Sequence, residues 1–212
     1  MILYYSPGAC SLVPHIALEE TGSAFDSKRV VLAEGEHLTP DYLAINPHAR
    51  VPALDVDGQV ITENVAILNY IAHRWQAPGS VPLDDHIAAA RCNQLLGWFA
   101  SSVHVAFAQI WRAERFTTDE DVHPAIQAGG HEVLDRYFGE IEAQIADGWI
   151  VPGYFTAADS YLLTFFRWGR RVGKEMKPYP RWRALVDRVL ERPAVRRVLA
   201  TEGFEAAEFI PA

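Results

Sequence analysis

A polar pair, Glu63 and Asn64, opens a helical pattern directly after a β-branched run at 60–61. Apolar residues then recur at helical spacing over 65–72. The first free N–H groups of a helix attract an anion such as a carboxylate or phosphate. Because Glu63 would repel a second anion and attract an ammonium, the pair suits a ligand with both groups, such as an amino acid or peptide end. The simpler interpretation is that the two residues only begin a helix.

Cys10 is the second group that could carry chemistry. It follows a Ser-Pro-Gly-Ala turn and stands at the start of a helix predicted over 11–21. A helix N-terminus favours the thiolate, so we expect a lowered thiol pKa and a nucleophilic Cys10. Ser11 and Tyr5 are hydroxyl alternatives for the same role, and a buried, unreactive Cys10 is the simpler one. Cys92, inside a long predicted helix, is interpreted as structural.

Val51 and Pro52 open a predicted strand over 51–56 with a proline, which is unusual. A cis bond there would require an edge position and would turn the Val51 backbone outward. The free N–H and C=O could then pair with an extended peptide beside the helix N-termini. An ordinary proline at the start of a strand is the alternative.

His104 belongs to a stripe of small residues on one helix face that also includes Gly97 and Ala108. It is either a hydrogen-bonded core histidine or, if the stripe faces the thiol, a site residue. Four aromatic residues could line an apolar pocket, although aromatic residues are core by default: Phe107, Trp111, Phe165 and Trp168. The remaining histidines show no ligand spacing, so no metal site is predicted.

The pattern divides the chain into a small α/β domain over 1–76, a Pro- and Gly-rich linker over 77–83 and an all-helical domain over 84–212. In the first domain, strands are predicted at 2–5, 30–32, 51–56 and 59–61, with Asp57-Gly58 as a hairpin turn, and helices at 11–21 and 63–76. In the second, helices are predicted at 84–116, 124–147, 157–172, 181–191 and 194–200. Residues 156–159 fit a capping box.

Composition excludes several classes of function. The formal charge of −8 argues against nucleic acid or an anionic membrane as the main partner. No apolar run approaches a membrane span, and the start of the chain does not read as a signal peptide. Two cysteines without a CxxC motif indicate a reduced, cytoplasmic protein.

Several motifs together resemble the bacterial beta-class glutathione transferases: Tyr4 to Ser11, Pro14-His15, Asn46-Pro47, Val51-Pro52, Thr62-Glu63 and the cap at 156–159. The resemblance extends along nearly the whole chain. It implies a thioredoxin-like N-terminal domain, an all-helical C-terminal domain and a homodimer formed by the helices at 63–76 and 84–116. It also implies glutathione as co-substrate, with its γ-glutamyl group at Glu63 and Asn64, its cysteinyl backbone on Val51 and its thiol towards Cys10.

In the family, the matching cysteine can form a mixed disulfide with glutathione and the matching histidine assists, which assigns these roles to Cys10 and His104. Three residues depart from the family pattern: Gly97 replaces an asparagine, Val105 a lysine, and Asn64 a glycine or serine. The expected function is transfer of glutathione to hydrophobic electrophiles, with thiol–disulfide reductase activity through Cys10. The alternatives are a non-catalytic scaffold of the same fold and a glutathione-dependent isomerase or dehalogenase.

Overall fold

The structure is a computed structural model that describes residues 1–146 and 148–210. Its N-terminal part contains one four-stranded sheet in the order β2-β1-β3-β4. The strands are β1 (Ile2–Tyr5), β2 (Asp26–Arg29), β3 (Ala53–Val56) and β4 (Gln59–Thr62). β1 pairs in parallel with β2 and antiparallel with β3, and β3 and β4 form the predicted hairpin.

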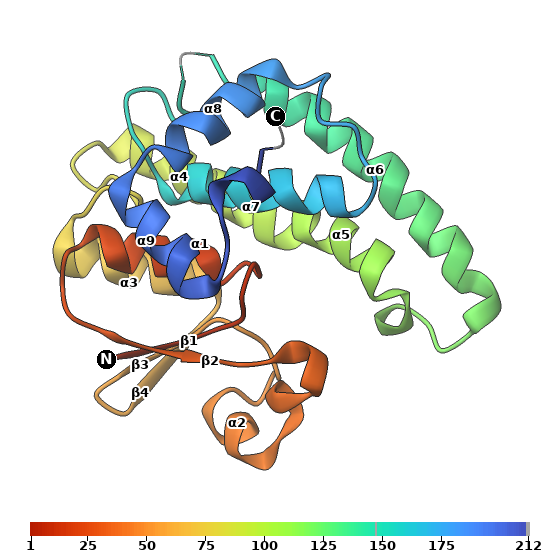
Figure 1. Cartoon of the computed structure of the whole chain (residues 1–212), viewed down its shortest axis with the longest axis horizontal. Helices are drawn as coiled ribbons and strands as arrows, with labels where there is room; N and C mark the ends of the chain where they lie inside the picture. The colour runs from red at the N-terminus through yellow and green to blue at the C-terminus, as the bar shows by residue number, and fades with distance from the viewer. Residues whose placement is uncertain (147, 211–212) are drawn as a thin grey trace.

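The alternation of side chains along β1 separates two cores. Leu3 and Tyr5 pack on the face covered by α1 (Leu12–Glu20) and α3 (Asn64–Trp75), whereas Tyr4 packs on the opposite face. There, Tyr4 meets α2 (Pro40–Ile45), which follows two short 3-10 helices, η1 (Leu32–Glu34) and η2 (Glu36–Leu38). This layered arrangement confirms the thioredoxin-like fold predicted for the N-terminal part (Figure 1).

The strand predicted at 30–32 is wrong. The strand is β2, four residues earlier, and all four of its side chains are exposed. Val30 is the first residue after it and donates its N–H to the Tyr5 carbonyl oxygen at 2.7 Å. The prediction relied on hydrophobicity, which identifies buried strands. β2 is instead an edge strand that pairs with β1 alone. Its polar residues are typical of edge strands, because they resist pairing with other chains.

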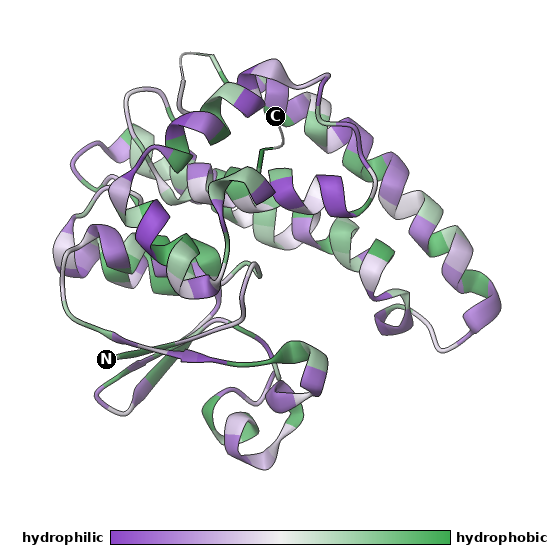
Figure 2. Ribbon diagram, viewed as in Figure 1, coloured by the Kyte–Doolittle hydropathy of each residue, from purple (hydrophilic) through white to green (hydrophobic). Residues whose placement is uncertain are grey.

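The C-terminal part is helical in the residues that the structure describes. Its helices are α4 (His86–Trp98), α5 (His104–Trp111), α6 (His123–Gln144), α7 (Ala157–Arg171), α8 (Pro180–Leu190) and α9 (Pro193–Glu202). Short 3-10 helices lie at η4 (Ala113–Arg115), η5 (Glu120–Val122) and η6 (Ala206–Glu208). The helix predicted at 124–147 corresponds to α6, and its predicted last residue lies outside the described residues. In Figure 2, hydrophilic and hydrophobic residues alternate along α6, as expected of a helix that packs on one face.

The single helix predicted at 84–116 is divided. A π-helical segment, η3 (Phe99–Val103), separates α4 from α5, and η4 follows α5. Because π-helical turns shift the helix register and often accompany functional sites, the segment changes the direction in which His104 points.

The predicted capping box begins α7. The Asp159 carboxylate accepts hydrogen bonds from the Thr156 N–H at 2.8 Å, the Thr156 hydroxyl at 3.0 Å and the Ile150 N–H at 3.0 Å. Desolvation by burial raises the pKa of Asp159 to about 7, although these hydrogen bonds oppose the shift. The box fixes the start of α7, which carries several residues of the site.

The two parts share one hydrophobic core. α1 packs against both α7 and α9, and seven consecutive residues from Leu12 to Leu18 are buried. Two ion pairs join α9 and its N-cap residue to α1: Arg192, the N-cap, with Glu20 at 2.6 Å, and Arg197 with Glu19 at 2.5 Å. Among the described residues, no helix is long and apolar enough to cross a membrane.

Candidate functional site

The turn between β1 and α1 carries Cys10 and is closed by Ser11. The Ser11 hydroxyl accepts a hydrogen bond from the Ser6 N–H at 3.1 Å and donates to the Ser6 carbonyl oxygen at 3.2 Å. Ser11 has no exposed surface. Tyr5 lies in the main core with its ring 4.9 Å from that of His15, and burial raises its pKa. The structure therefore does not bring either predicted hydroxyl to the exposed side of Cys10.

The helical part fixes this turn through Gly8. The Gly8 N–H donates to the Glu202 carboxylate at 2.8 Å, and its carbonyl oxygen accepts from the Trp168 indole at 2.8 Å. The other oxygen of Glu202 lies 2.8 Å from Nδ1 of His15. Gly8 has a φ of +67°, and a Cβ there would lie 2.5 Å from Nη1 of Arg167. The backbone angle therefore favours glycine, and a Cβ would also have to displace the Arg167 guanidinium.

Cys10 is partly buried and lies before α1, which begins at Leu12. Its thiol donates to the Val51 carbonyl oxygen, with the sulfur 3.7 Å away. Desolvation by burial raises the pKa of Cys10 to about 12, and the Glu63 carboxylate raises it further, while the Asn64 amide and Arg50 lower it. The prediction of a lowered pKa is wrong, because burial outweighs the effect of the helix terminus and a carbonyl acceptor stabilises the S–H form.

The peptide bond between Val51 and Pro52 is cis. The residues precede β3, which lies between β1 and β4, so the edge position expected for such a bond is not observed. The neighbouring Arg50 is held by its carbonyl oxygen, which accepts hydrogen bonds from the Tyr42 hydroxyl and the Asn46 amide, both at 2.7 Å. The Val51 carbonyl thus lies at a fixed position beside Cys10.

The polar pair at α3 divides between two environments. Glu63 is the N-cap residue, with an exposed side chain and a φ of +66°, a conformation that is rare outside glycine. Asn64 is 6% exposed, and its side-chain amide donates to the Cys10 carbonyl oxygen at 3.0 Å and to the Tyr161 hydroxyl at 2.5 Å. The side-chain nitrogen of Asn64 therefore joins the α3 terminus to the Cys10 turn and is not free to bind a ligand.

His104 begins α5 and is partly buried. Its ring lies 5.2 Å from Trp168, edge to face, and Trp168 in turn bonds to Gly8. Desolvation lowers the pKa of His104 to about 4, and the charges of Arg50 and Arg115 add to the shift. His104 is thus neutral at physiological pH and can exchange hydrogen bonds but supplies no positive charge.

The four predicted pocket aromatics form one cluster. Phe107 and Phe165 are stacked with ring centres 5.5 Å apart and have no exposed surface, and Trp168 is 5% exposed. Only Trp111 retains appreciable exposure; it stacks on Phe107 and contacts Trp168 edge to face at 5.2 Å. Phe107 and Phe165 are core residues beneath the site, so Trp111 is the member that a ligand could reach.

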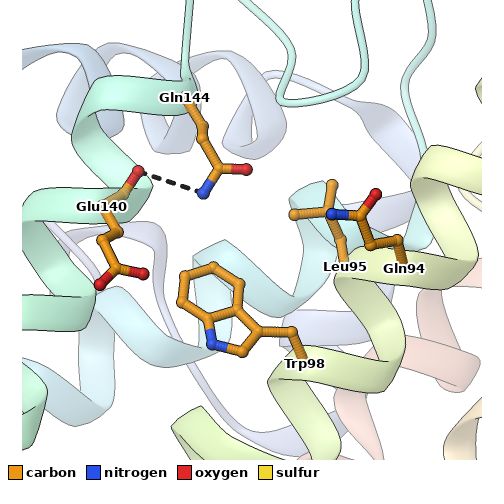
Figure 3. A pocket seen from close by; sticks show the side chains of 5 residues that line it. All are labelled: Gln94, Leu95, Trp98, Glu140 and Gln144. Carbon is orange, nitrogen blue, oxygen red and sulfur yellow. Dashed lines mark hydrogen bonds between the residues drawn. The ribbon is translucent and has the colours of Figure 1, made fainter.

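One pocket is formed by residues other than those predicted for the site. Figure 3 shows a pocket between α4 and α6, where the side chain of Gln144 donates to the Glu140 carbonyl oxygen at 3.2 Å. It is lined by Gln94, Leu95, Trp98, Glu140 and Gln144, none of which is a predicted site residue. Within the described residues, no group of three or more potential metal-binding side chains is present.

The sequence compares with known families over most of its length. A model described as the glutathione S-transferase N-terminal domain matches residues 1–73, and the C-terminal domain model matches residues 103–193. The chain belongs to the glutathione S-transferase family. The predicted family and fold are therefore confirmed.

Among curated relatives of this glutathione S-transferase family member, the chain is 34% identical to glutathione S-transferase GstA of Escherichia coli O157:H7, covering 97% of the chain and 100% of the relative. It is 32% identical to a maleylacetoacetate isomerase of Pseudomonas aeruginosa, covering 93% and 94%. A glutathione transferase homologue from Sulfitobacter with bound glutathione superimposes with a TM-score of 0.89 at 31% identity, covering 94% and 97%. A beta-class transferase from Sphingomonas chungbukensis gives 0.82 at 34%, covering 97% and 100%.

Sequence reasoning assigned no role to Glu202 or Tyr161, which this family member uses to hold its Cys10 turn. A signal for Glu202 exists, because it lies four residues after Val198 on the buried face of α9. An acidic side chain at a core-facing position indicates an internal partner. No comparable signal marks Tyr161, whose hydroxyl partner is 97 residues away.

Proposed function

We propose that this chain is a glutathione transferase that binds glutathione across the α3 terminus, Val51 and Cys10, and transfers it to an electrophile. The Glu63 carboxylate would receive the γ-glutamyl ammonium, and the first free N–H groups of α3, including that of Asn64, its carboxylate. The cysteinyl backbone would pair with Val51. The relative from Sulfitobacter with bound glutathione supports this ligand.

One observation carries the proposal. Glu63 holds an exposed carboxylate at a φ of +66° directly before the free amides of α3, while Asn64 bonds to the Cys10 carbonyl oxygen at 3.0 Å. Strained backbone of this kind costs free energy and clusters at ligand-binding positions. The anchor for an amino acid group and the thiol thus belong to one rigid unit, which suits a ligand that reaches from one to the other.

The raised pKa of Cys10 keeps its thiol protonated, which supports a role as hydrogen-bond donor. In the free protein its S–H donates to the Val51 carbonyl oxygen. When a peptide occupies the Val51 backbone, the S–H becomes available to the incoming sulfur and stabilises it as thiolate, the reactive form. That thiolate forms a bond to the electrophilic carbon, the leaving group departs with its electron pair, and the thiol proton passes to water.

The electrophile would bind beside Trp111 and His104. Trp111 offers the accessible apolar surface, and the neutral His104 exchanges a hydrogen bond with the reacting groups. We further propose that the protein acts in detoxification as a cytoplasmic homodimer. In support, both cysteines of the chain are free thiols in the described structure, which suits a reducing compartment.

Calorimetric titration with reduced glutathione tests this function. We expect binding in the micromolar to low-millimolar range, weakened about tenfold or more in Glu63→Gln because a charge-assisted hydrogen bond is lost. Glu132→Gln is the matched control, since Glu132 is exposed on α6 and removes the same charge. No detectable binding to the unmodified protein would refute the transferase and favour the scaffold of the same fold.

Cys10→Ala separates two activities. Conjugation to an aryl halide should fall by about tenfold through loss of one hydrogen bond to the thiolate. Reduction of a glutathionylated peptide through Cys10 should be slow in the unmodified protein, because little Cys10 is thiolate at neutral pH. It should be absent in Cys10→Ala, because the mixed disulfide can no longer form. Unchanged rates in both assays would exclude a role for the Cys10 thiol.

A second candidate is glutathione-dependent isomerisation, which the 32% identity to a maleylacetoacetate isomerase favours. Here the thiolate would add to a conjugated double bond and leave again after rotation about the resulting single bond. Product analysis separates the two: a transferase consumes glutathione in proportion to product, whereas an isomerase regenerates it.

A further inference from the structure

Arg167 on α7 lies against the backbone of Gly8, in the turn that carries Cys10. A Cβ on Gly8 would lie 2.5 Å from Nη1 of Arg167 and 3.0 Å from Cζ of the Phe204 ring. The guanidinium and the ring thus fill the space beside the Gly8 α-carbon. The helical part therefore contacts Gly8 at its N–H, at its carbonyl oxygen and at its α-carbon.

Two aromatic rings that follow α9 hold the Arg167 guanidinium in this position. Cζ of Arg167 lies 4.3 Å from the centre of the Phe204 ring and 5.6 Å from the centre of the Phe209 ring. The two rings meet edge to face, with their centres 5.9 Å apart. Phe209 has no exposed surface. The guanidinium is thus held by cation–π contacts with residues near the C-terminal end of the chain.

A hydrogen bond ties the same stretch of chain to α7. Nη1 of Arg170, three residues after Arg167, donates to the Glu208 carbonyl oxygen at 2.8 Å. Figure 1 shows the chain returning from α9 to α7 at this point. We call residues 204–210 the C-terminal segment. The segment therefore packs on α7 close to the residue that contacts Gly8.

Packing alone does not explain an arginine at position 167. Among residues 1–146 and 148–210, Nη1 of Arg167 is buried and has no hydrogen-bond partner. A buried polar atom without a partner costs free energy, which an apolar side chain would avoid. The cation–π contacts offset part of this cost. In addition, the guanidinium is a flat group that fits between the Phe204 ring and Gly8, which has no side chain.

We propose that Arg167 is a positioning residue for Cys10 and that the C-terminal segment holds it against Gly8. Gly8 precedes Cys10 by two residues, and the Cys10 thiol donates to the Val51 carbonyl oxygen with the sulfur 3.7 Å away. A shift of Gly8 moves the thiol relative to this acceptor, so the C-terminal segment determines where the sulfur lies. The consequence for catalysis rests on the proposed glutathione transferase function, whereas the consequence for the thiol does not.

The first test measures local opening of the turn as the rate at which iodoacetamide alkylates Cys10. Arg167→Gln and Phe204→Leu each remove one partner of the cation–π contact and keep a side chain in its place. Cys10 of the folded protein should react about three- to tenfold faster in each variant, the equivalent of one cation–π contact. The double variant should react about as fast as either single variant, because both changes remove the same contact.

Cys92 provides a reference within the same molecule. It lies on α4 and has no exposed surface, so its alkylation reports general unfolding. Its rate should not change in the variants. Equal acceleration of Cys10 and Cys92 would show that Arg167 only stabilises the fold. An unchanged Cys10 rate would show that Arg167 does not hold the turn. Either result would overturn the proposal.

Arg136→Gln is the matched control. Arg136 lies on α6, and its Cζ is 5.3 Å from the centre of the neighbouring Tyr137 ring. The variant therefore loses the same charge and the same kind of contact on a different helix. Cys10 should react in it as in the unmodified protein. Acceleration equal to that in Arg167→Gln would mean that net charge, and not the position of the turn, governs the rate, which would refute the inference.

Conjugation of glutathione to an aryl halide provides the functional readout. Arg167→Gln should lower kcat about three- to tenfold, while the calorimetric affinity for glutathione stays within about twofold, because the proposed anchor at Glu63 is unchanged. An equal loss of affinity would mean that Arg167 supports the whole site, and would contradict a role confined to the thiol. If the unmodified protein does not bind glutathione, the proposed function fails, and alkylation still decides whether Arg167 positions Cys10.

Discussion

The inner and outer sides of the Cys10 turn are built in opposite ways. On the inner side, buried groups satisfy one another: Gly8 bonds to Glu202 and Trp168, and Asn64 bonds to the Cys10 carbonyl oxygen. On the outer side, the charged side chains of Glu63, Arg50 and Arg115 are exposed and take part in none of the ion pairs of the described residues. The difference teaches which groups hold the fold and which are available to a ligand. The former should govern stability, and the latter binding.

Cys10 lies at the boundary between the two sides. The largest effect that we predict is on the rate at which its thiol reacts. With a pKa of about 12 in place of 9.0, its thiolate fraction near neutral pH should be about a thousandfold below that of a free thiol. Alkylation by iodoacetamide, followed at the Cys10 peptide by mass spectrometry, should accelerate about tenfold per pH unit up to pH 10. Rapid alkylation at pH 7 would contradict this, and urea-unfolded protein provides the unprotected reference.

The same shift affects stability in a defined direction. Because the folded pKa is raised, the folded state holds the proton more tightly than the unfolded chain between pH 9 and 12. The contribution of Cys10 is complete below pH 9 and is lost as pH rises through 12. Cys10→Ala should therefore unfold with a weaker dependence on pH above 9 than the unmodified protein.

Loss of Glu202 should cause the largest change in stability. Glu202→Ala removes the bond to Gly8 and leaves His15 without its partner, which should cost about 2–4 kcal/mol. Urea denaturation measures the change, and Glu132→Ala on the exposed side of α6 should stay within about 0.5 kcal/mol. Equal losses in the two variants would show that the inner side does not hold the turn.

Asn64→Ala should have an intermediate effect, about 1–2 kcal/mol, because two hydrogen bonds from a buried amide are lost. Its distinguishing result is faster alkylation of Cys10 in the folded protein. Asn69→Ala is the matched control: its amide bonds to Val65 and Asn93 within the helices and does not contact Cys10. If both variants changed Cys10 reactivity alike, the bridge from Asn64 would not position the turn.

The smallest change in the free energy of unfolding is expected for a residue of the outer side. Arg115→Gln should leave the free energy of unfolding unchanged or raise it by up to about 0.5 kcal/mol, since it relieves repulsion from Arg50 and Arg112. The gain should disappear at high salt. A clear loss of stability, measured by urea denaturation, would mean that Arg115 supports the fold and would weaken the contrast between the two sides.

Features fixed by neighbouring residues could be predicted from the sequence. The Asp57-Gly58 hairpin and the Thr156–Asp159 cap depend on a few adjacent side chains, and both are observed. The strand at 30–32 was mispredicted because the position of β2 depends on its pairing with β1, which local hydrophobicity does not encode.

At the site, sequence identified the residues but not their environments. The helix-end argument for Cys10 omitted burial, which reverses the direction of its pKa shift. The side chain of Asn64 was assigned to a ligand because its partner, Tyr161, is distant in sequence. The effect of Arg50 and Arg115 on the pKa of His104 was missed for the same reason, since Arg50 is distant from His104 in sequence.

The bond from Glu202 to Gly8 also orders events during synthesis. Residues 1–75 leave the ribosome long before α9, yet the turn at Gly8 is complete only when Glu202 arrives. A nascent chain that stops before α9 would contain every ligand-binding residue discussed above but would lack the carboxylate that fixes their frame. Because α9 is translated late, the thiol site can become ordered only in chains that already include α9.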